Sequence, residues 1–238
     1  IRPIPHTMAE HRMALLEIRD LKKSFASPDG QTSVIIDMPV FDLEAARQVG
    51  LKGSSGTGKT TFLNLIAGIL TPDSGRITVD GVDVTALPES QRDRFRGRSI
   101  GYIFQTFNLL QGFSCLENVL LGMSFGPGAD AARAEALLRR VGLADRMRYK
   151  PAQLSTGQQQ RVAVARALAS RPKLVLADEP TGNLDPVNSR ASLALIREVC
   201  SEEKAALLLV SHDQEVLAQF EHVESLATLN RAAREGSR

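Results

Sequence analysis

Short apolar runs separated by polar or glycine-containing turns recur along the chain, and they predict strands. The run 173–177 is apolar from its second residue onward, which is typical of a parallel strand buried on both faces. Pro39 interrupts the run 34–41, which indicates a strand at the edge of a sheet. The remaining predicted strands lie at 15–25, 47–51, 76–79, 99–104 and 205–210.

A second pattern, with apolar residues three or four positions apart, predicts helices. Between 116 and 171 no strand pattern interrupts it, so this stretch is expected to be an all-helical block inserted between strands. Within the block, 130–141 predicts a helix that Gly142 ends. Ser155 and Gln158 form a capping-box pair, which predicts the start of a helix that continues to Ser170.

Composition and charge narrow the class of protein. Lys and Arg total 29 against 27 for Asp and Glu, so the net charge of +2 provides no general attraction for nucleic acid, and no nucleic-acid partner is expected. Cys115 and Cys200 lack metal-ligand spacing and are expected to be free, packed thiols in a reducing compartment. Even the longest apolar runs, such as 207–210, are too short to cross a bilayer. Residues 1–7 lack a signal-peptide core and are expected to be a scar or disordered residues ahead of Met8.

The most informative chemical motif follows the predicted strand 47–51. Residues 53–60 fit the pattern G-x-x-x-x-G-K-[ST]. They lie between a predicted strand and a predicted helix, which is the setting that a phosphate-binding loop requires. The alternative is a glycine-rich turn that fits the pattern by chance. Glycines let backbone N–H groups surround a phosphate, and the helix N-terminus adds partial positive charge. Lys59 would reach the β- and γ-phosphates, and the Thr60 hydroxyl would ligate Mg²⁺. The predicted nucleotide-binding residues here are Gly53, Ser54, Ser55, Gly56, Thr57, Gly58, Lys59, Thr60 and Thr61.

Polar side chains follow several predicted strands. Asp178 and Glu179 end the strand 173–177, and ligands of such sheets bind at the carboxyl ends of strands, so both are expected beside the phosphate loop. Asp178 would hold the Mg²⁺ shell and Glu179 would orient or deprotonate water, although the pair could also simply start a loop. His212 follows the strand 205–210 and favours a phosphate-facing role. Gln105 follows the strand 99–104, and by itself it predicts only a polar residue at the end of that strand.

In this order, GSSGTGKT, Gln105, LSTGQ, LVLADE, NLD and SHD resemble the nucleotide-binding subunit of ABC transporters over 15–210. LSTGQQQR followed by LADEP at this distance is far more specific than a phosphate loop alone. The resemblance implies an α/β fold: a P-loop ATPase core with a mainly parallel sheet, an antiparallel β subdomain and an inserted α-helical subdomain. It implies one ATPase domain over 8–230, with a core at 8–105 and 172–230, a helical subdomain at about 106–171 and a tail at 231–238.

The resemblance also implies roles for residues that the pattern alone leaves ambiguous. Phe25, equally compatible with a base-stacking position and a core position, would stack on adenine. Gln105 would join Mg²⁺ and sense the γ-phosphate, and His212 would hold the γ-phosphate and the attacking water. The cofactors implied are ATP and Mg²⁺. The implied catalytic residues are Glu179 as general base, His212 and Lys59, and the implied metal ligands are Thr60, Gln105 and Asp178.

The signature stretch 154–158 is implied to act across a dimer. A capped helix start presents Ser155 and backbone N–H groups to an anion, which in the family is the γ-phosphate bound by a second subunit. ATP is therefore expected between two ATP-binding subunits arranged head to tail, with a homodimer expected and a heterodimer as the alternative. The residues implied to act at this interface are Ser155, Gly157, Gln158 and Asp185.

Three departures from the family pattern carry expectations of their own. Thr156 stands where glycine is usual, and its side chain is expected to obstruct the opposing γ-phosphate. Residues 44–48 lack the usual glycine-containing turn before the phosphate-loop strand. Residues 221–238 lack the common Asp-Gly hairpin, so an irregular chain end is expected.

TFNLL, LENV and LADEPTGNLD resemble the branch that serves lipoprotein release, macrolide-type export and cell-division complexes. The chain is accordingly expected at the cytoplasmic face of the inner or plasma membrane, docked on transmembrane permease subunits. An apolar segment containing Phe104, Phe107 and Phe113 would be either core or a docking patch for those subunits. The alternatives are a nucleotide-binding regulatory subunit with weak ATPase activity and a soluble non-transport ABC ATPase.

Overall fold

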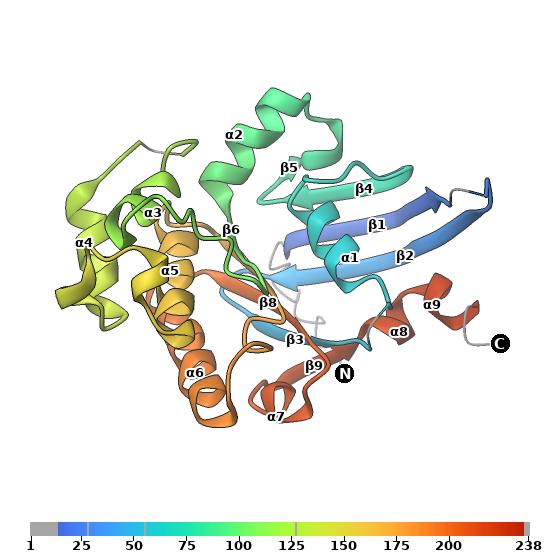
Figure 1. Ribbon diagram of the computed structural model, residues 1–238. Helices are drawn as coiled ribbons and strands as arrows, with labels where there is room; N and C mark the ends of the chain where they lie inside the picture. The colour runs from blue at the N-terminus through green and yellow to red at the C-terminus, as the bar shows by residue number, and fades with distance from the viewer. Residues whose placement is uncertain (1–13, 28, 55, 127, 236–238) are drawn as a thin grey trace, which may run out of the picture.

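Two sheets of different type organise the structure, a computed structural model that describes residues 14–235 apart from 28, 55 and 127 (Figure 1). The antiparallel sheet has the order β2 (Thr32–Glu44), β1 (Ala14–Ala26), β4 (Ser74–Val79) and β5 (Val82–Asp83). The parallel sheet has the order β6 (Ile100–Ile103), β7 (Leu174–Asp178), β8 (Ala206–Ser211), β3 (Gln48–Lys52) and β9 (His222–Ser225). The α/β fold with a parallel and an antiparallel sheet is confirmed, and so is the edge position that Pro39 predicts for β2.

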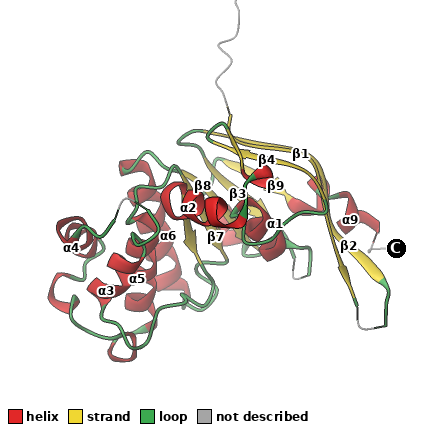
Figure 2. Ribbon diagram, turned by 90° about the horizontal axis from the view of Figure 1, so that it is seen from above, coloured by secondary structure: helices red, strands yellow, loops and turns green. Residues whose placement is uncertain are grey.

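Helices surround the parallel sheet unevenly, with α3 to α6 gathered away from the antiparallel sheet (Figure 2). Residues 116–171, so far as the structure describes them, contain helices and no strand, as the sequence predicts. No helix in the described part of the chain is long and apolar enough to cross a membrane. The longer helices are α1 (Lys59–Ile66), α2 (Glu89–Ser99), α3 (Cys115–Leu121), α4 (Ala131–Arg140), α5 (Thr156–Leu168) and α6 (Pro186–Glu202), and the short ones are α7 (Gln214–Leu217), α8 (Leu226–Leu229) and α9 (Arg231–Glu235).

The parallel strands are apolar at nearly every position because both of their faces are buried. In β7, Val175 and Ala177 pack in one core cluster with the helices α3 to α6. Leu174 and Leu176 alternate with them and face a second cluster, formed with α1 and the antiparallel sheet. The sheet therefore lies between two hydrophobic cores, and its strand ends are held rigidly where the polar residues begin.

The turn before β3 compensates for its missing glycine. Arg47 N–H donates to the Glu44 carbonyl at 3.3 Å, and Ala46 adopts a left-handed backbone with φ of 58°. An alanine is disfavoured in this conformation by about 1 kcal/mol. The chain thus makes the turn without glycine, and β3 still pairs with β8 from its first residue.

The end of the chain is more regular than the sequence predicts. Instead of an irregular segment, β9 pairs with β3, and α9 contacts β2 (Figure 2). Asn230, which is buried, accepts a hydrogen bond from Asp37 N–H at 2.7 Å and donates one to the Ile35 carbonyl at 2.8 Å. The expectation failed because the side chains of β9 are mostly exposed, so no apolar alternation marks the strand.

Candidate functional site

A pocket of about 520 Å³ gathers residues from the carboxyl ends of the parallel strands. Because β7, β8 and β3 are neighbours in the sheet, the residues that follow them meet although they are far apart in sequence. The sequence did not predict Ile35 as one of the lining residues. The predicted residues that line the pocket are Phe25, Gly56, Gly58, Lys59, Thr60, Thr61, Gln105, Asp178, Glu179 and His212.

A Cβ atom would make a close contact at two described glycines of the phosphate loop between β3 and α1. Gly58 has φ of 87°, and a Cβ atom there would come within 3.0 Å of the side chains of Ile35 and Ile36. At Gly53 a Cβ atom would lie 2.7 Å from Thr57 Oγ1, whose hydroxyl donates to the Ser54 carbonyl at 2.8 Å. Ser55 lies outside the described residues. Gly58 leaves the start of α1 without a side-chain cap, so the first N–H groups of the helix are free to bind an anion.

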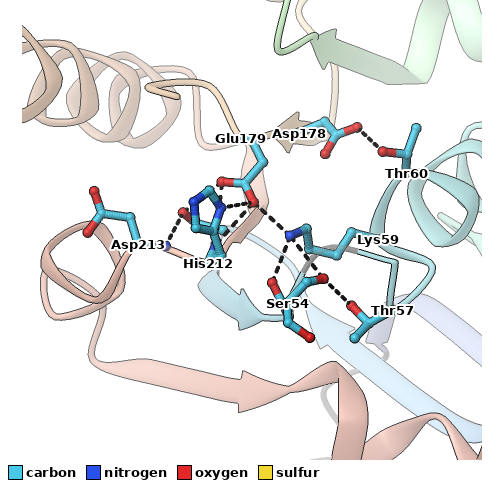
Figure 3. Close-up of polar contacts among 10 residues, drawn as sticks. Ser54, Thr57, Lys59, Thr60, Asp178, Glu179, His212 and Asp213 are labelled. Atoms are coloured by element: carbon cyan, nitrogen blue, oxygen red, sulfur yellow. Dashed lines mark hydrogen bonds and ion pairs between the residues drawn. The ribbon is translucent and has the colours of Figure 1, made fainter. Parts of the chain in front are cut away.

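Lys59 lies at the centre of the polar contacts in the pocket (Figure 3). Its ammonium donates to the carbonyls of Gly53 and Ser54, at 2.7 and 3.3 Å, and pairs with Glu179 Oε1 at 2.8 Å. The Lys59 and Glu179 side chains are only 10% and 7% exposed. A buried cation is thus held at the mouth of the phosphate loop.

Glu179 is surrounded by hydrogen-bond donors from the adjacent strand end. Its carboxylate accepts from Ser211 Oγ at 3.0 Å and from His212 N–H at 3.1 Å, and it lies 2.7 Å from His212 Nδ1 (Figure 3). Burial acts to raise the pKa of Glu179, but the hydrogen bonds from Lys59, His212 and Ser211 outweigh it and lower that pKa. Glu179 is therefore a carboxylate at neutral pH, in a state that can accept a proton.

The backbone of Glu179 is unusual as well. Its φ of 44° lies in the left-handed region, where residues with a Cβ are disfavoured. Its N–H donates to the Val210 carbonyl at 3.0 Å, which fixes the chain as it leaves β7. This conformation turns consecutive acidic side chains toward different partners, because Glu179 meets Lys59 while Asp178 meets Thr60.

Asp178 has one carboxylate oxygen with a hydrogen-bond partner and one without among the described residues. Its Oδ2 accepts from Thr60 Oγ1 at 2.7 Å, whereas its Oδ1 is buried without a hydrogen-bond partner among the described residues. Burial raises the pKa of Asp178, which the hydrogen bond from Thr60 partly opposes. No group of three or more His, Cys, Asp or Glu side chains in the described chain is placed to hold a metal. Mg²⁺ commonly uses one or two carboxylates together with substrate phosphates, so the unpaired Oδ1 beside the Thr60 hydroxyl fits that ion.

Phe25 and Gln105 border the pocket from two other elements. Phe25 lies near the end of β1 and is 42% exposed. It is therefore not in the core, which was one of the two positions that the sequence left open. Gln105 follows β6, and its carbonyl accepts from Asn183 Nδ2 at 2.8 Å. The side chains of both residues line the pocket.

The signature residues lie outside this pocket. Ser155 caps α5 in the predicted capping box, because its Oγ accepts from Gln158 N–H at 3.4 Å and its own N–H donates to Gln158 Oε1 at 3.1 Å. A Cβ atom at Gly157 would meet only Asn188 Oδ1, at 3.9 Å, so the helix start is open on that side. Asp185 caps α6 by accepting from the N–H groups of residues 187 and 188, and it does not line the pocket either.

Ile35 and Ser211 are the two contributors that the sequence did not reveal. Ile35 reaches the pocket only because β2 passes beside Gly58, which no local pattern indicates. Ser211 could have been found from strand pairing, since Asp178 pairs with Val210 in the parallel register and Glu179 and Ser211 are the next residues.

A strand, phosphate loop and helix beside an acidic strand end in a parallel sheet define a P-loop nucleoside-triphosphatase. A family model described as "ABC transporter" matches residues 37–182. The chain belongs to the ABC transporter family, as an ATP-binding subunit that hydrolyses ATP.

Similar proteins agree with this assignment over most of the chain. The lipoprotein-releasing system ATP-binding protein LolD of Pseudomonas fluorescens is 41% identical over 214 residues, covering 88% of this chain and 93% of that protein. The macrolide export ATP-binding/permease protein MacB of Syntrophobacter fumaroxidans is 41% identical over 214 residues, but this chain covers only 29% of it. A dimeric structure of the ATP-binding cassette MJ0796 in a post-hydrolysis state with ADP and Pi has a TM-score of 0.81 and 30% identity, covering 92% of this chain and 95% of that one.

Proposed function

We propose that two copies of this chain close around ATP head to tail and drive permease subunits of a lipoprotein-release or macrolide-export-like system, at the cytoplasmic face of the membrane. The similarity to LolD along nearly its full length and the dimeric relatives support the proposal. The observation that carries it is the position of the signature helix start. Ser155 is exposed and lies outside its own phosphate pocket, so it is available to a nucleotide held by a second copy.

Each predicted site residue has a role in this arrangement. Lys59 and the N–H groups of the loop and of the α1 start bind the phosphates, while Phe25 stacks on adenine. Glu179 accepts a proton from the attacking water, and His212, whose Nδ1 faces Glu179, directs its other ring nitrogen toward the γ-phosphate. From the second copy, Ser155 and the neighbouring signature residues would contact the γ-phosphate. Asp185 would signal across the dimer interface when the two copies close.

Thr60, Asp178 and Gln105 are the residues that would hold Mg²⁺. The unpaired Asp178 Oδ1 beside the Thr60 hydroxyl supports this assignment. When bound, the ion would offset the negative charge of the β- and γ-phosphates.

Replacing Thr156 with glycine is expected to strengthen ATP-driven dimerisation without stabilising the isolated subunit. Thr156 is the exposed first residue of α5, so its side chain would lie against the opposing γ-phosphate but contributes little to the fold of its own copy. Sedimentation of the wild type and of Thr156→Gly with ATP, in a Glu179→Gln background that slows turnover, gives the two dimerisation constants. Equal constants would show that the threonine is simply accommodated.

The apolar segment containing Phe104, Phe107 and Phe113 is partly buried and partly exposed. Phe107 is buried in the helical-side core, and the Phe104 ring stacks on Tyr102 at a centroid distance of 4.2 Å. Leu110 and Phe113, in contrast, are exposed, Phe113 to 44%. Truncating Phe107 would therefore disturb the core, so only the exposed residues of this segment can be tested for docking without touching the core. The proposed docking surface therefore consists of Leu110 and Phe113.

Leu110→Ser combined with Phe113→Ser is expected to abolish co-purification with the permease subunits while the subunit still folds and binds ATP. Exposed apolar residues contribute little to the fold, whereas a helix docked in a groove depends on them. Val40→Ser is the matched control, because Val40 is at least as exposed but lies on β2 in the antiparallel sheet. Melting temperature, ATP affinity and co-purification with the permease subunits are measured on the wild type, the double variant and Val40→Ser. Normal assembly of the double variant would place the docking site elsewhere.

A further inference from the structure

The loop that carries Gln105 has an unusual backbone. Phe107 and Asn108, which follow Gln105 closely, have φ values of 58° and 48°. Two consecutive residues with a Cβ in the left-handed region are uncommon, because each is sterically disfavoured there. Such a conformation persists only where the surrounding structure holds it, and so the contacts of this loop determine its position.

Arg166 of α5 provides the strongest of these contacts. Its two terminal nitrogens donate to the carbonyls of Asn108 and Phe107, both at 2.6 Å. Burial lowers the pKa of the Arg166 guanidinium, and no carboxylate in the described residues acts to raise it. The half-buried guanidinium is therefore directed at two carbonyl dipoles. A planar guanidinium can donate to two adjacent oxygens at once, which a lysine ammonium cannot do in the same geometry.

The same helix is also attached to the turn that follows Glu179. Gln160 of α5 is fully buried, and its Nε2 donates to the Pro180 carbonyl. The Gln105 carbonyl, in turn, accepts from Asn183 in the loop after that turn. Thus α5 contacts the loop of Gln105 through Arg166 and the turn after Glu179 through Gln160. Both Gln105 and Glu179 line the phosphate pocket.

We propose that Arg166 is a positioning residue for ATP hydrolysis, which sets the place of Gln105 relative to Glu179 by holding the carbonyls of Phe107 and Asn108. Arg166 contacts no residue of the phosphate loop among its hydrogen bonds in the described chain, so it acts through the Gln105 loop and not on the nucleotide. The inference rests on the proposed role of Gln105.

The test is Arg166→Lys, which keeps the positive charge and removes the two-pronged contact. We expect kcat of the full chain to fall by about tenfold or more, because small misplacements of active-site groups have effects of this size. The Kd for ATP and the binding stoichiometry are expected to stay within about twofold of wild type, since the phosphate loop is untouched. Amide hydrogen exchange at 106–109 is expected to accelerate. Stoichiometry is measured by calorimetry and reports the folded fraction.

Arg161→Lys is the matched control. Arg161 lies on the same helix and also donates to a carbonyl, that of Val141 at 2.8 Å, but this contact leads to the helix α4. Its kcat and its exchange at 106–109 are expected to stay at wild-type values. An equal loss of kcat in Arg161→Lys, or a loss of stoichiometry in Arg166→Lys that matches its loss of activity, would overturn the proposal in favour of a general structural role.

A third variant, Gln105→Ala, separates this inference from the function on which it rests. If Gln105→Ala lowers kcat and Arg166→Lys does not, the positioning role of Arg166 is wrong and the proposed site stands. If Gln105→Ala leaves kcat unchanged, the proposed role of Gln105 fails, and the inference fails with it.

Discussion

Glu179→Gln is expected to bind ATP and to hydrolyse it at least about a hundredfold more slowly than the wild type, the effect typical of losing a general base. Glutamine keeps the shape of the side chain and can still accept hydrogen bonds from Ser211 or His212. It cannot take a proton from water. ATP affinity should be retained or increased, because Lys59 loses a carboxylate that competes with phosphate for its ammonium.

Single-turnover hydrolysis and equilibrium ATP binding are the measurements, and sedimentation should show that the variant accumulates as an ATP-bound dimer. Glu215→Gln makes the same chemical change at an exposed carboxylate that pairs with Arg190 at 3.4 Å. Because Glu215 does not line the phosphate pocket, the turnover of Glu215→Gln should equal that of the wild type. Near-normal hydrolysis by Glu179→Gln would remove Glu179 from the catalytic role.

Lys59→Ala is expected to affect binding before chemistry. A hydrogen bond to a charged group contributes about 1.5–3 kcal/mol, so the Kd for ATP should rise by roughly ten- to a hundredfold. The substitution also leaves the buried Glu179 carboxylate without its cation, and the pKa of Glu179, which hydrogen bonding to Lys59 helps to lower, should rise. Both effects arise from the same ammonium.

Calorimetric titration with ATP measures the first effect directly. Lys52→Ala is the control, since Lys52 is an exposed lysine at the end of β3, immediately before the loop. It removes the same charge from the neighbourhood without touching the loop carbonyls that Lys59 contacts. An unchanged Kd in Lys59→Ala would mean that the backbone of the loop binds the phosphates by itself.

The parts of the site that sequence reasoning reached are those whose chemistry is local. The glycines at 53 and 58 are required by contacts that a Cβ atom would violate, so the loop motif carries its own structural reason. The acidic pair lies at the end of a strand buried on both faces, and such a strand can be recognised from its uninterrupted apolar run. The capping box of Ser155 and Gln158 is likewise local and was confirmed.

The parts that sequence reasoning missed depend on which segments become neighbours. Ile35 enters the pocket through the packing of β2 against the loop, and Ser211 through the register of β7 with β8. Phe107 and Phe113 look alike in sequence, yet Phe107 is core and Phe113 is exposed, and no local pattern indicates the left-handed backbone at Phe107 and Asn108. The sequence did not predict the strand β9, because its exposed residues carry no apolar pattern.

The hydrogen bonds of Asn230 have a consequence for how the molecule behaves in a crowded cell. An edge strand such as β2 presents free N–H and C=O groups on which another polypeptide strand can pair, the first step toward fibrils and precipitates. Asn230 engages one donor and one acceptor of that edge, at Asp37 and Ile35, and α9 packs against the same strand. The final helical turns thereby cover the part of β2 nearest the phosphate loop, and strands of other proteins cannot pair with the two backbone groups that Asn230 engages.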